Sequence, residues 1–419
     1  MRIGIDAHAA EREGSGNCTY IRQLLLELGR IDTRNDYFIY VINPSHPFYQ
    51  KLKQYKNFYL KSLYVNSPFI RIPIFLGWRS WADRLDLLHV QYIAPPFHRG
   101  RLILTVHDLG HFVIPHAFSR FEVFRSKMLI PEAIRRATVI LTGSRYSRSE
   151  ISERFNTPLE KIIYIPYGVS PEFFKFSSLN LTKEKFSHLI NYFFNYLSDF
   201  SELEEGKGLT EEKVREDMRE KINEIMNVTK KKYGIKGPYF FSLSRLNPRK
   251  NFPLLIEAFN LLKETKKIPH QLLIGGKIDV KYKSIIEIIK KSPYKDDIKL
   301  LGFVPEDDLG YLYSGAEAFI FLSEYEGFGL PVLEAMACGT PVIASFIGPI
   351  REVAADAAVY VESFSPSEVA SKMLTLIENK DLNQHLREKG VERACLFSWR
   401  ETARLTLQAY ECAAQGKKF

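Results

Sequence analysis

Short apolar runs alternate with amphipathic stretches along the first 170 residues of the chain. The runs are typical of buried strands, and the stretches with apolar residues three and four apart predict helices. Strands that alternate with helices predict a parallel, doubly wound sheet. The predicted strands are Arg2–Asp6, Tyr37–Asn43, Leu87–Gln91, Ile103–His107, Val139–Gly143 and Ile162–Pro166, and the helices include Thr19–Gly29, Phe121–Ala137 and Ser147–Phe155.

The same pattern restarts after residue 237 and predicts a second sheet. Two such halves predict an α/β protein with two Rossmann-like domains that face a cleft, with ligands bound at the carboxyl ends of the strands. A capped helix is predicted from Ser398 to Ala413. The strands of the second half are predicted at Tyr239–Ser244, Gln271–Gly275, Lys299–Val304, Ala318–Leu322, Pro341–Ala344 and Ala358–Val361.

The segment 171–236 belongs to neither half and predicts a linker with an inserted helical hairpin. Its apolar positions repeat at helical spacing twice, and a Gly206-Lys207-Gly208 turn lies between the two stretches. Packing on the second domain and docking of a membrane or partner are both open roles. The predicted domains are therefore 1–170, 171–236, 237–397 and 398–419. The apolar positions are Phe186, Leu189, Ile190, Phe193, Phe194 and Leu197, followed by Val214, Met218, Ile222 and Ile225.

Composition narrows the class of protein. The chain has 419 residues, 45% hydrophobic and 26% charged, as expected of a globular protein with room for two cores. No apolar run has the length of a membrane span, and the chain starts with a strand instead of a signal peptide. Its four Cys residues show neither a disulfide framework nor metal-ligand spacing, so a reducing cytoplasm is expected.

Positive charge is concentrated in residues 46–84. This range holds seven Lys and Arg residues and a single acid, Asp83, for a net charge of +6, and aromatic residues are interleaved with the cations. Such a surface can meet an anionic membrane, a nucleic acid or an acidic substrate. A solvated face with the aromatic side chains turned into the core is an equally good interpretation.

The most informative motif is the string from Ser323 to Ser345. It predicts a buried strand, a glycine-rich turn, a short helix that starts at Pro331 and stops at Gly339, and a second buried strand. Free N–H groups at the helix start favour an anion, and Glu326 and Glu334 add two carboxylates. A nucleotide sugar offers both phosphate and hydroxyl groups. The alternative is a structural helix whose acids merely complement its dipole.

The whole string resembles the signature of retaining glycosyltransferases of family 4. That resemblance implies the two-domain GT-B fold, with a C-terminal helix that crosses back to the first domain. It implies that Glu326 holds hydroxyls of the donor sugar and that Glu334 holds the ribose. Backbone amides at the helix start would hold the diphosphate, with Gly327, Phe328, Gly329, Leu330, Val332 and Leu333 among the donor-binding residues.

A second motif, Ser244-Arg245-Leu-Asn-Pro-Arg-Lys250-Asn251, follows the first strand of the second half. Arg and Lys five residues apart across a turn can converge on one diphosphate, although such a pair is most often surface charge. The motif matches the family's Arg-Leu-x-x-x-Lys-Asn element, which implies that Arg245 and Lys250 neutralise the leaving group. We therefore count Arg245, Lys250, Glu326 and His107 as the catalytic candidates.

His107 and Asp108 end a buried strand of the first half. A single His is usually structural, but the string resembles the family's His-Asp element, in which the His lies against the donor sugar. Gly14 and Gly16 open the helix after the first strand, where backbone can approach a phosphate. The family usually has a basic residue and an aromatic after the second glycine. Asn17-Cys18-Thr19-Tyr20 departs from that pattern, which leaves Asn17 and Tyr20 as acceptor-side candidates only. Asp108 and Arg145 are further acceptor-side candidates.

Three other strand ends complete the predicted donor site. Ser144 ends a strand of the first half, and Ser147 is a candidate helix cap. By resemblance, the turn with Phe303 and Val304 holds the nucleobase, and Gly275 keeps bulky side chains away from the nucleotide.

The expected activity is metal-independent transfer of a hexose with retention and without a cofactor. The string Thr105-Val-His-Asp-Leu-Gly-His-Phe112, with Pro115 following, looks most like bacterial transferases that use GDP-mannose in O-antigen or exopolysaccharide assembly, and a UDP-sugar donor is the alternative. A saccharide or lipid-linked acceptor would place the protein in the cytoplasm with peripheral membrane contact through 46–84. A phosphorylase, an epimerase or a catalytically silent nucleotide-sugar-binding or docking module are the readings from other classes. The sequence leaves the linkage and the oligomeric state open.

Overall fold

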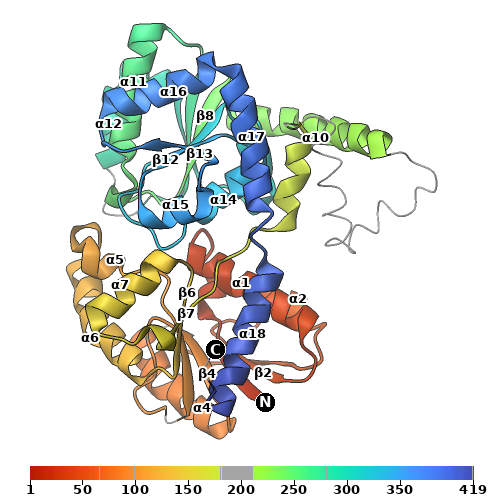
Figure 1. The fold of residues 1–419 in the computed structure, drawn as a ribbon, viewed down its shortest axis with the longest axis vertical. Coiled ribbons are helices and arrows are strands. Elements are labelled where there is room, and N and C mark those ends of the chain that lie inside the picture. Colours follow the sequence, from red (N-terminus) through yellow and green to blue (C-terminus); the bar gives the residue numbers. More distant parts are fainter. Residues whose placement is uncertain are drawn as a thin grey trace. The chain divides into compact units, whose positions relative to one another are not determined.

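The computed structural model describes the chain except residues 66, 99, 180, 182–210, 279–281, 283 and 418. The described residues form two compact units, each with its own parallel sheet (Figure 1). This architecture confirms the predicted α/β class with two Rossmann-like domains. The first unit comprises Met1–Gly168, Tyr325–Phe328 and Ser398–Phe419, and the second comprises Val169–Glu324 and Gly329–Phe397.

The sheet of the first unit has seven parallel strands in the order β3-β2-β1-β4-β5-β6-β7. Most of its strands are continuously buried, as parallel strands covered on both faces must be. The edge strand β3 is only partly buried and was not predicted. The strands are β1 (Arg2–Asp6), β2 (Asp36–Val41), β3 (Phe58–Ser62), β4 (Leu87–Gln91), β5 (Arg101–Thr105), β6 (Val139–Thr142) and β7 (Ile162–Tyr164).

Helices cover both faces of this sheet. Helix α1 begins three residues earlier than predicted because the Ser15 side chain caps it by accepting the N–H of Cys18. The predicted C-terminal helix is present as α18, which is capped by Ser398 and packs beside α1 (Figure 1). The helices are α1 (Gly16–Ile31), α2 (Pro47–Leu52), α3 (Pro68–Ile70), α4 (Gly77–Ala82), α5 (Gly110–Val113), α6 (Arg120–Arg136), α7 (Arg145–Phe155) and α18 (Trp399–Gln415), with the π-helix η2 (Arg71–Leu76) and the 3-10 helices η1 (His8–Glu11), η3 (Pro115–Ala117) and η4 (Leu159–Lys161).

Two successive residues of strand β4 show which helices share a face of the sheet. In β4, Leu88 joins a core cluster with Leu76 of η2 and Ile130 of α6. The next residue, His89, lies 2.6 Å through Nδ1 from the hydroxyl of Tyr410 in α18. Because successive side chains of a strand point to opposite faces, η2 and α6 cover one face of the sheet, and α18 covers the other together with α1.

The second unit repeats this architecture with six parallel strands in the order β10-β9-β8-β11-β12-β13. All six predicted strands are present, and each matches within one residue at its first position and within two at its last. The strands are β8 (Tyr239–Leu243), β9 (Gln271–Gly275), β10 (Ile298–Gly302), β11 (Ala318–Phe321), β12 (Val342–Ser345) and β13 (Ala358–Val361).

Helices of the second unit enclose its own apolar core, which is formed mainly by α11, α16 and the central strands. The helices are α10 (Glu211–Tyr233), α11 (Phe252–Lys266), α12 (Ser284–Lys291), α13 (Glu306–Ser314), α14 (Leu330–Ala337), α15 (Gly348–Ala354), α16 (Pro366–Glu378) and α17 (Lys380–Ala394), with the turns η5 (Pro171–Leu179), η6 (Pro248–Lys250) and η8 (Lys295–Asp297).

Helix α10 is the second helix of the predicted hairpin, and the first helix and the Gly206-Lys207-Gly208 turn lie outside the described residues. It packs on α13 and η5, with Ile222 and Met226 buried. At its end the hydroxyl of Tyr233 donates to Oδ2 of Asp308 at 2.6 Å. Part of the apolar side of α10 is thus used for packing within the second unit, whereas Ile225 remains 45% exposed.

Candidate functional site

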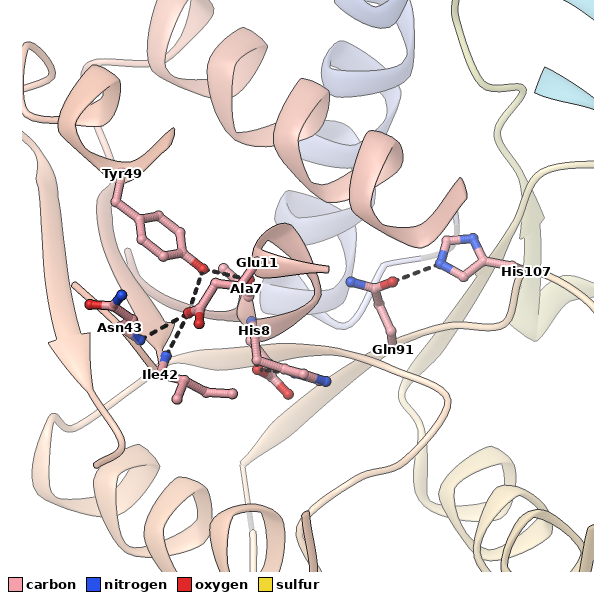
Figure 2. Close-up of polar contacts among 9 residues, drawn as sticks. Ala7, His8, Glu11, Ile42, Asn43, Tyr49, Gln91 and His107 are labelled. Carbon is pink, nitrogen blue, oxygen red and sulfur yellow. Dashed lines mark hydrogen bonds and ion pairs between the residues drawn. The ribbon is translucent and has the colours of Figure 1, made fainter. Parts of the chain in front are cut away.

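His107 follows strand β5 by two residues, and both of its ring nitrogens have hydrogen-bond partners. Nδ1 lies 2.6 Å from the Tyr167 hydroxyl, and Nε2 lies 2.8 Å from Oε1 of Gln91 (Figure 2). The side chain is 6% exposed, and burial lowers the pKa of His107 to about 3. The ring is therefore neutral near pH 7. Because an amide oxygen can only accept, Nε2 carries the hydrogen and Nδ1 accepts from the tyrosine.

Gln91 is a site residue that the sequence analysis missed. It ends strand β4, which pairs with β5, and its amide oxygen fixes the His107 ring. Its Nε2 atom is buried, and no described residue accepts a hydrogen bond from it. In Figure 2 this nitrogen points away from His107, toward the loop of Ala7 and His8 that follows β1. The signal available in the sequence was that Gln91 and His107, two polar residues, end two predicted strands that follow each other along the chain.

Aromatic side chains pack against the His107 ring. The ring of Tyr20 meets His107 edge-on at 4.8 Å, and its hydroxyl lies 3.1 Å from Oγ1 of Thr105. Tyr167 stacks on Trp399 with ring centroids 5.9 Å apart. Tyr20 was predicted at the acceptor edge, but the structure buries it and its hydroxyl is occupied by Thr105. Its contribution in this conformation is to position His107.

The segment Tyr325–Phe328, which carries the first signature carboxylate, packs within the first unit. The Tyr325 hydroxyl donates to Glu150 at 2.5 Å and accepts the N–H of Leu109 at 2.8 Å. A Cβ at Gly327 would lie 2.0 Å from the His107 carbonyl oxygen, so only glycine permits this approach. Glu326, between them, is 8% exposed. The structure thus brings Glu326 and His107 onto the same unit.

The glycine loop after β1 is open. Gly14 and Gly16 are exposed, and Gly14 has φ +80°, a conformation that favours glycine. Asn17 is half-buried in the first turn of α1. The loop therefore leaves backbone accessible at the N-terminus of a 16-residue helix, as a phosphate would require.

Glu11 organises the neighbouring loop and was also missed. Its Oε1 accepts the N–H groups of Ile42 and Asn43 at 2.8 and 3.0 Å and the Tyr49 hydroxyl at 3.1 Å (Figure 2). The Tyr49 hydroxyl also lies 2.9 Å from the carbonyl oxygen of Ala7. This carboxylate ties the ends of β1 and β2 together, which is a structural role.

Ser144, Arg145 and Asp108 lie at other strand ends of the first unit. Ser144, rather than Ser147, caps α7: its Oγ accepts the Ser147 N–H at 3.0 Å and also donates to Ser147 Oγ. Arg145 is exposed, with its guanidinium 5.1 Å over the Tyr164 ring. Oδ1 of Asp108 accepts the N–H of Gly110 at 2.9 Å, which stabilises the turn into α5.

Arg245 and Lys250 follow β8 in the second unit, as predicted from their motif. Arg245 is exposed, whereas Lys250 is buried with Nζ 4.8 Å from the centroid of Phe321 at the end of β11. The Arg249 carbonyl accepts the N–H of Glu324 at 2.9 Å. Because β8 and β11 are neighbouring parallel strands, the cationic motif and the start of the signature lie at one edge of the sheet.

Helix α14 starts at Leu330, one residue before the predicted Pro331, and it stops before Gly339 as predicted. Gly329 has φ +111°, and a Cβ there would lie 2.4 Å from Ile350. The N–H groups of Val332 and Leu333 donate to the Gly329 carbonyl. The amides of Val332 and Leu333, which were predicted to hold the diphosphate, are therefore already engaged within the helix.

Glu334 lies one turn into α14 and is partly buried. Its Oε2 accepts a hydrogen bond from the Tyr313 hydroxyl at 2.9 Å. Burial raises the pKa of Glu334 to about 7, and the hydrogen bond from Tyr313 opposes that rise. A carboxyl group with this pKa changes its charge near physiological pH. Such shifted pKa values are common at ligand-binding sites.

The nucleobase turn lies at the end of β10. Phe303 is half exposed, with Lys277 Nζ 4.6 Å from its ring centroid, and Val304 is buried. A Cβ at Gly275 would lie 2.9 Å from Leu243 and 3.1 Å from Val304. Gly275 thus accommodates protein side chains, a reason for glycine that the sequence analysis did not give.

Among the described residues, no group of three or more His, Cys, Asp or Glu side chains could hold a metal ion. In the same part of the chain, no helix is both long and apolar enough to span a membrane.

Two family models match the chain. The model described as Glycosyltransferase Family 4 matches residues 19–173, and the model described as Glycosyl transferases group 1 matches residues 225–393. The O-antigen chain mannosyltransferase B of Escherichia coli is 26% identical over 337 residues, which are 80% of this chain and 77% of that protein. The mannosylfructose-phosphate synthase of Agrobacterium fabrum is 28% identical over 191 residues, 43% of this chain and 42% of the synthase.

Solved structures share the fold of the chain. Anabaena Alr3699/HepE in complex with UDP-glucose aligns over 98% of this chain and 99% of its own, with a TM-score of 0.67 and 16% identity. WaaG, a glycosyltransferase involved in lipopolysaccharide biosynthesis, aligns over 98% of this chain and 99% of its own, with a TM-score of 0.67 and 13% identity. At these identities the likeness shows the fold.

Proposed function

Because the chain belongs to the family 4 glycosyltransferases, which have the GT-B fold, we propose that it transfers mannose from a nucleotide-diphosphate sugar to a saccharide or lipid-linked saccharide. The proposed reaction retains the configuration of the transferred sugar and needs no metal ion. Its setting would be the synthesis of a cell-surface polysaccharide, at the cytoplasmic face of a membrane.

The observation that carries the proposal is the convergence of two motifs at one edge of the second sheet. Arg245 and Lys250 follow β8, the signature follows the adjacent strand β11, and Lys250 Nζ lies against the ring that ends β11. Cleavage of a glycosyl phosphate builds negative charge on the leaving oxygen. Two cations and a helix start can neutralise that charge without a metal.

Retention is proposed to follow from a front-face substitution. The acceptor oxygen forms its bond to the anomeric carbon on the face from which the diphosphate leaves, and a leaving phosphate oxygen takes the acceptor's proton. His107 does not compete as a nucleophile or base, because both ring nitrogens are engaged and its pKa is about 3. Glu326 and Glu334 are assigned to donor-sugar and ribose hydroxyls.

Mannose is proposed because a relative that aligns over 80% of this chain is a mannosyltransferase. The alternative is a glucosyl or N-acetylhexosaminyl donor carried by UDP, and the UDP-glucose complex of the structurally similar Anabaena protein favours that choice. A catalytically silent nucleotide-sugar-binding or docking module is the alternative from another class.

Nucleotide release by the purified protein tests these choices. GDP-mannose, UDP-glucose, UDP-N-acetylglucosamine and UDP-galactose are offered in turn, with EDTA and with mannose oligosaccharides as acceptors. We expect GDP release from GDP-mannose alone, and its loss in Glu326→Ala and Lys250→Ala. Release from a UDP-sugar would replace mannose as the donor, and activity abolished by EDTA would contradict the metal-free reaction. Nucleotide binding without release from any donor would favour the silent module.

A further inference from the structure

The segment Pro68–Ala82, formed by α3, η2 and α4, exposes an apolar stripe. Ile70, Ile74, Trp78 and Trp81 are all exposed, and Trp81 reaches 79%. Their spacing of four, four and three residues places them on one side of a continuous helical stretch, whereas Leu76 on the other side is buried in the core. The stripe is not needed to close the core of the first unit.

Helix α6 exposes a second stripe. Phe121, Phe124 and Met128 repeat at helical spacing and point outward, with Phe124 66% exposed, and Leu129 widens the stripe. On its inner side, Ile130 belongs to the same core cluster as Leu76. Both stripes therefore lie on the outside of the same helical layer.

The loop 93–98, between β4 and β5, contacts both α4 and α6. Nδ1 of His98 lies 3.0 Å from Oγ of Ser80 in α4, and Arg136 at the end of α6 donates to the Pro95 carbonyl oxygen at 2.9 Å. Phe97 in this loop is 80% exposed. We call the combined surface the outer apolar face; it consists of Ile70, Ile74, Trp78, Trp81, Phe97, Phe121, Phe124, Met128 and Leu129.

Positive charge accompanies the outer apolar face. Residues 120–136 hold five Lys and Arg against two Glu, a net charge of +3. The guanidinium of Arg79 lies 5.0 Å from the Trp78 ring centroid, and Arg84, which follows α4, is exposed. Aromatic and aliphatic side chains flanked by cations match the boundary between acyl chains and anionic headgroups.

We propose that the outer apolar face lies on the surface of an anionic bilayer, with α4 and α6 parallel to it. The inference deepens the proposed function, since a lipid-linked acceptor would be presented at that surface, but the binding itself requires no turnover. It also assigns the positive charges of residues 46–84 to two opposite faces of the sheet. Helix α2 packs with α1 on the opposite face of the sheet, where Arg22 of α1 lies 5.2 Å over the ring of Phe48. Lys51 and Lys53 are then excluded from the contact.

Vesicle flotation of the full chain, without donor or acceptor, tests the proposal. One set of vesicles contains phosphatidylcholine alone, and the other contains equal parts of phosphatidylcholine and phosphatidylglycerol. We expect flotation with the anionic vesicles only. The pairs Trp78→Ser with Trp81→Ser, and Phe124→Ser with Met128→Ser, are each expected to weaken binding by about tenfold or more, since each removes two large apolar side chains from the contact.

The matched control is Lys51→Glu with Lys53→Glu, which reverses two exposed charges on the opposite layer and is expected to float as the unchanged protein does. Absence of flotation with anionic vesicles would overturn the proposal. So would flotation that survives both apolar pairs, or flotation lost in the lysine pair alone. A vesicle-free dimer that the Trp78 and Trp81 pair dissociates would identify the face as a contact between two copies instead. Flotation without sugar transfer would contradict only the proposed function.

Discussion

Replacement of Glu334 by Gln should stabilise the free protein above neutral pH. The carboxyl group is held in α14 with a single described hydrogen-bond donor, the Tyr313 hydroxyl, and burial raises its pKa from an ordinary 4.5 to about 7. That rise corresponds to about 3 kcal/mol between the two protonation states. The amide cannot ionise, so it avoids the whole penalty.

The sign of the pH dependence follows from the two states. Between pH 4.5 and about pH 7, the folded protein keeps the Glu334 proton that the unfolded chain has already lost. The free energy of unfolding therefore falls as pH rises through this range. The penalty is absent below it and complete, at about 3 kcal/mol, above it.

Denaturant unfolding of the unchanged protein and of Glu334→Gln measures this difference. At about pH 4 the two proteins should have nearly equal stability, and at about pH 8 the variant should be more stable by up to about 3 kcal/mol. Nucleotide binding should weaken in the same variant, because ribose hydroxyls lose a charged acceptor. Tyr313→Phe is the matched control, since loss of the donor should move the transition to higher pH. A stability difference that is the same at both pH values would refute the reasoning.

Three further predictions follow from single contacts. Gln91→Glu places a carboxylate against Nε2 of His107, so the His107 pKa should rise from about 3 and the pH–rate profile should gain a second titration in the acidic range, beside that of Glu334; an identical pH–rate profile would count against the assigned contact. Lys250→Ala should lower kcat by about 10²–10³ with a smaller effect on KM, measured with saturating donor, and a change in KM alone would mean that Lys250 serves only binding. Gly168→Ala would bring a methyl group 2.0 Å from the backbone nitrogen of Trp399, so thermal unfolding should show a loss of about 3 kcal/mol or more, and an unchanged melting temperature would disprove the tight approach.

Local pattern was sufficient for most of the fold. Parallel strands buried on both faces are continuous apolar runs, so β1, β4, β9 and β13 were predicted at their observed bounds. Strand β3 was missed because it is an edge strand and only partly buried, and its three apolar residues are followed at once by Lys61 and Ser62. Strand β5 both begins and ends two residues earlier than predicted, so His107 follows the strand instead of ending it.

The site was predictable where one segment builds it. The helix after Gly329 and the cations after β8 are local features, and their positions followed from residue order alone. The residues that contact His107 are Gln91, Tyr167 and Tyr20, which come from three distant segments. Their contacts therefore depend on strand register and on tertiary packing. The same holds for the burial of Lys250 against Phe321, which requires β8 and β11 to be neighbours.

The central claim is retaining transfer from a nucleotide sugar whose leaving group is neutralised by the protein. The most direct test follows the anomeric proton of the product by NMR as it forms from an α-linked donor, GDP-mannose first, with EDTA present. We predict that the new linkage is α from the earliest time point. A β linkage, or formation of product only when a divalent metal is restored, would contradict the account.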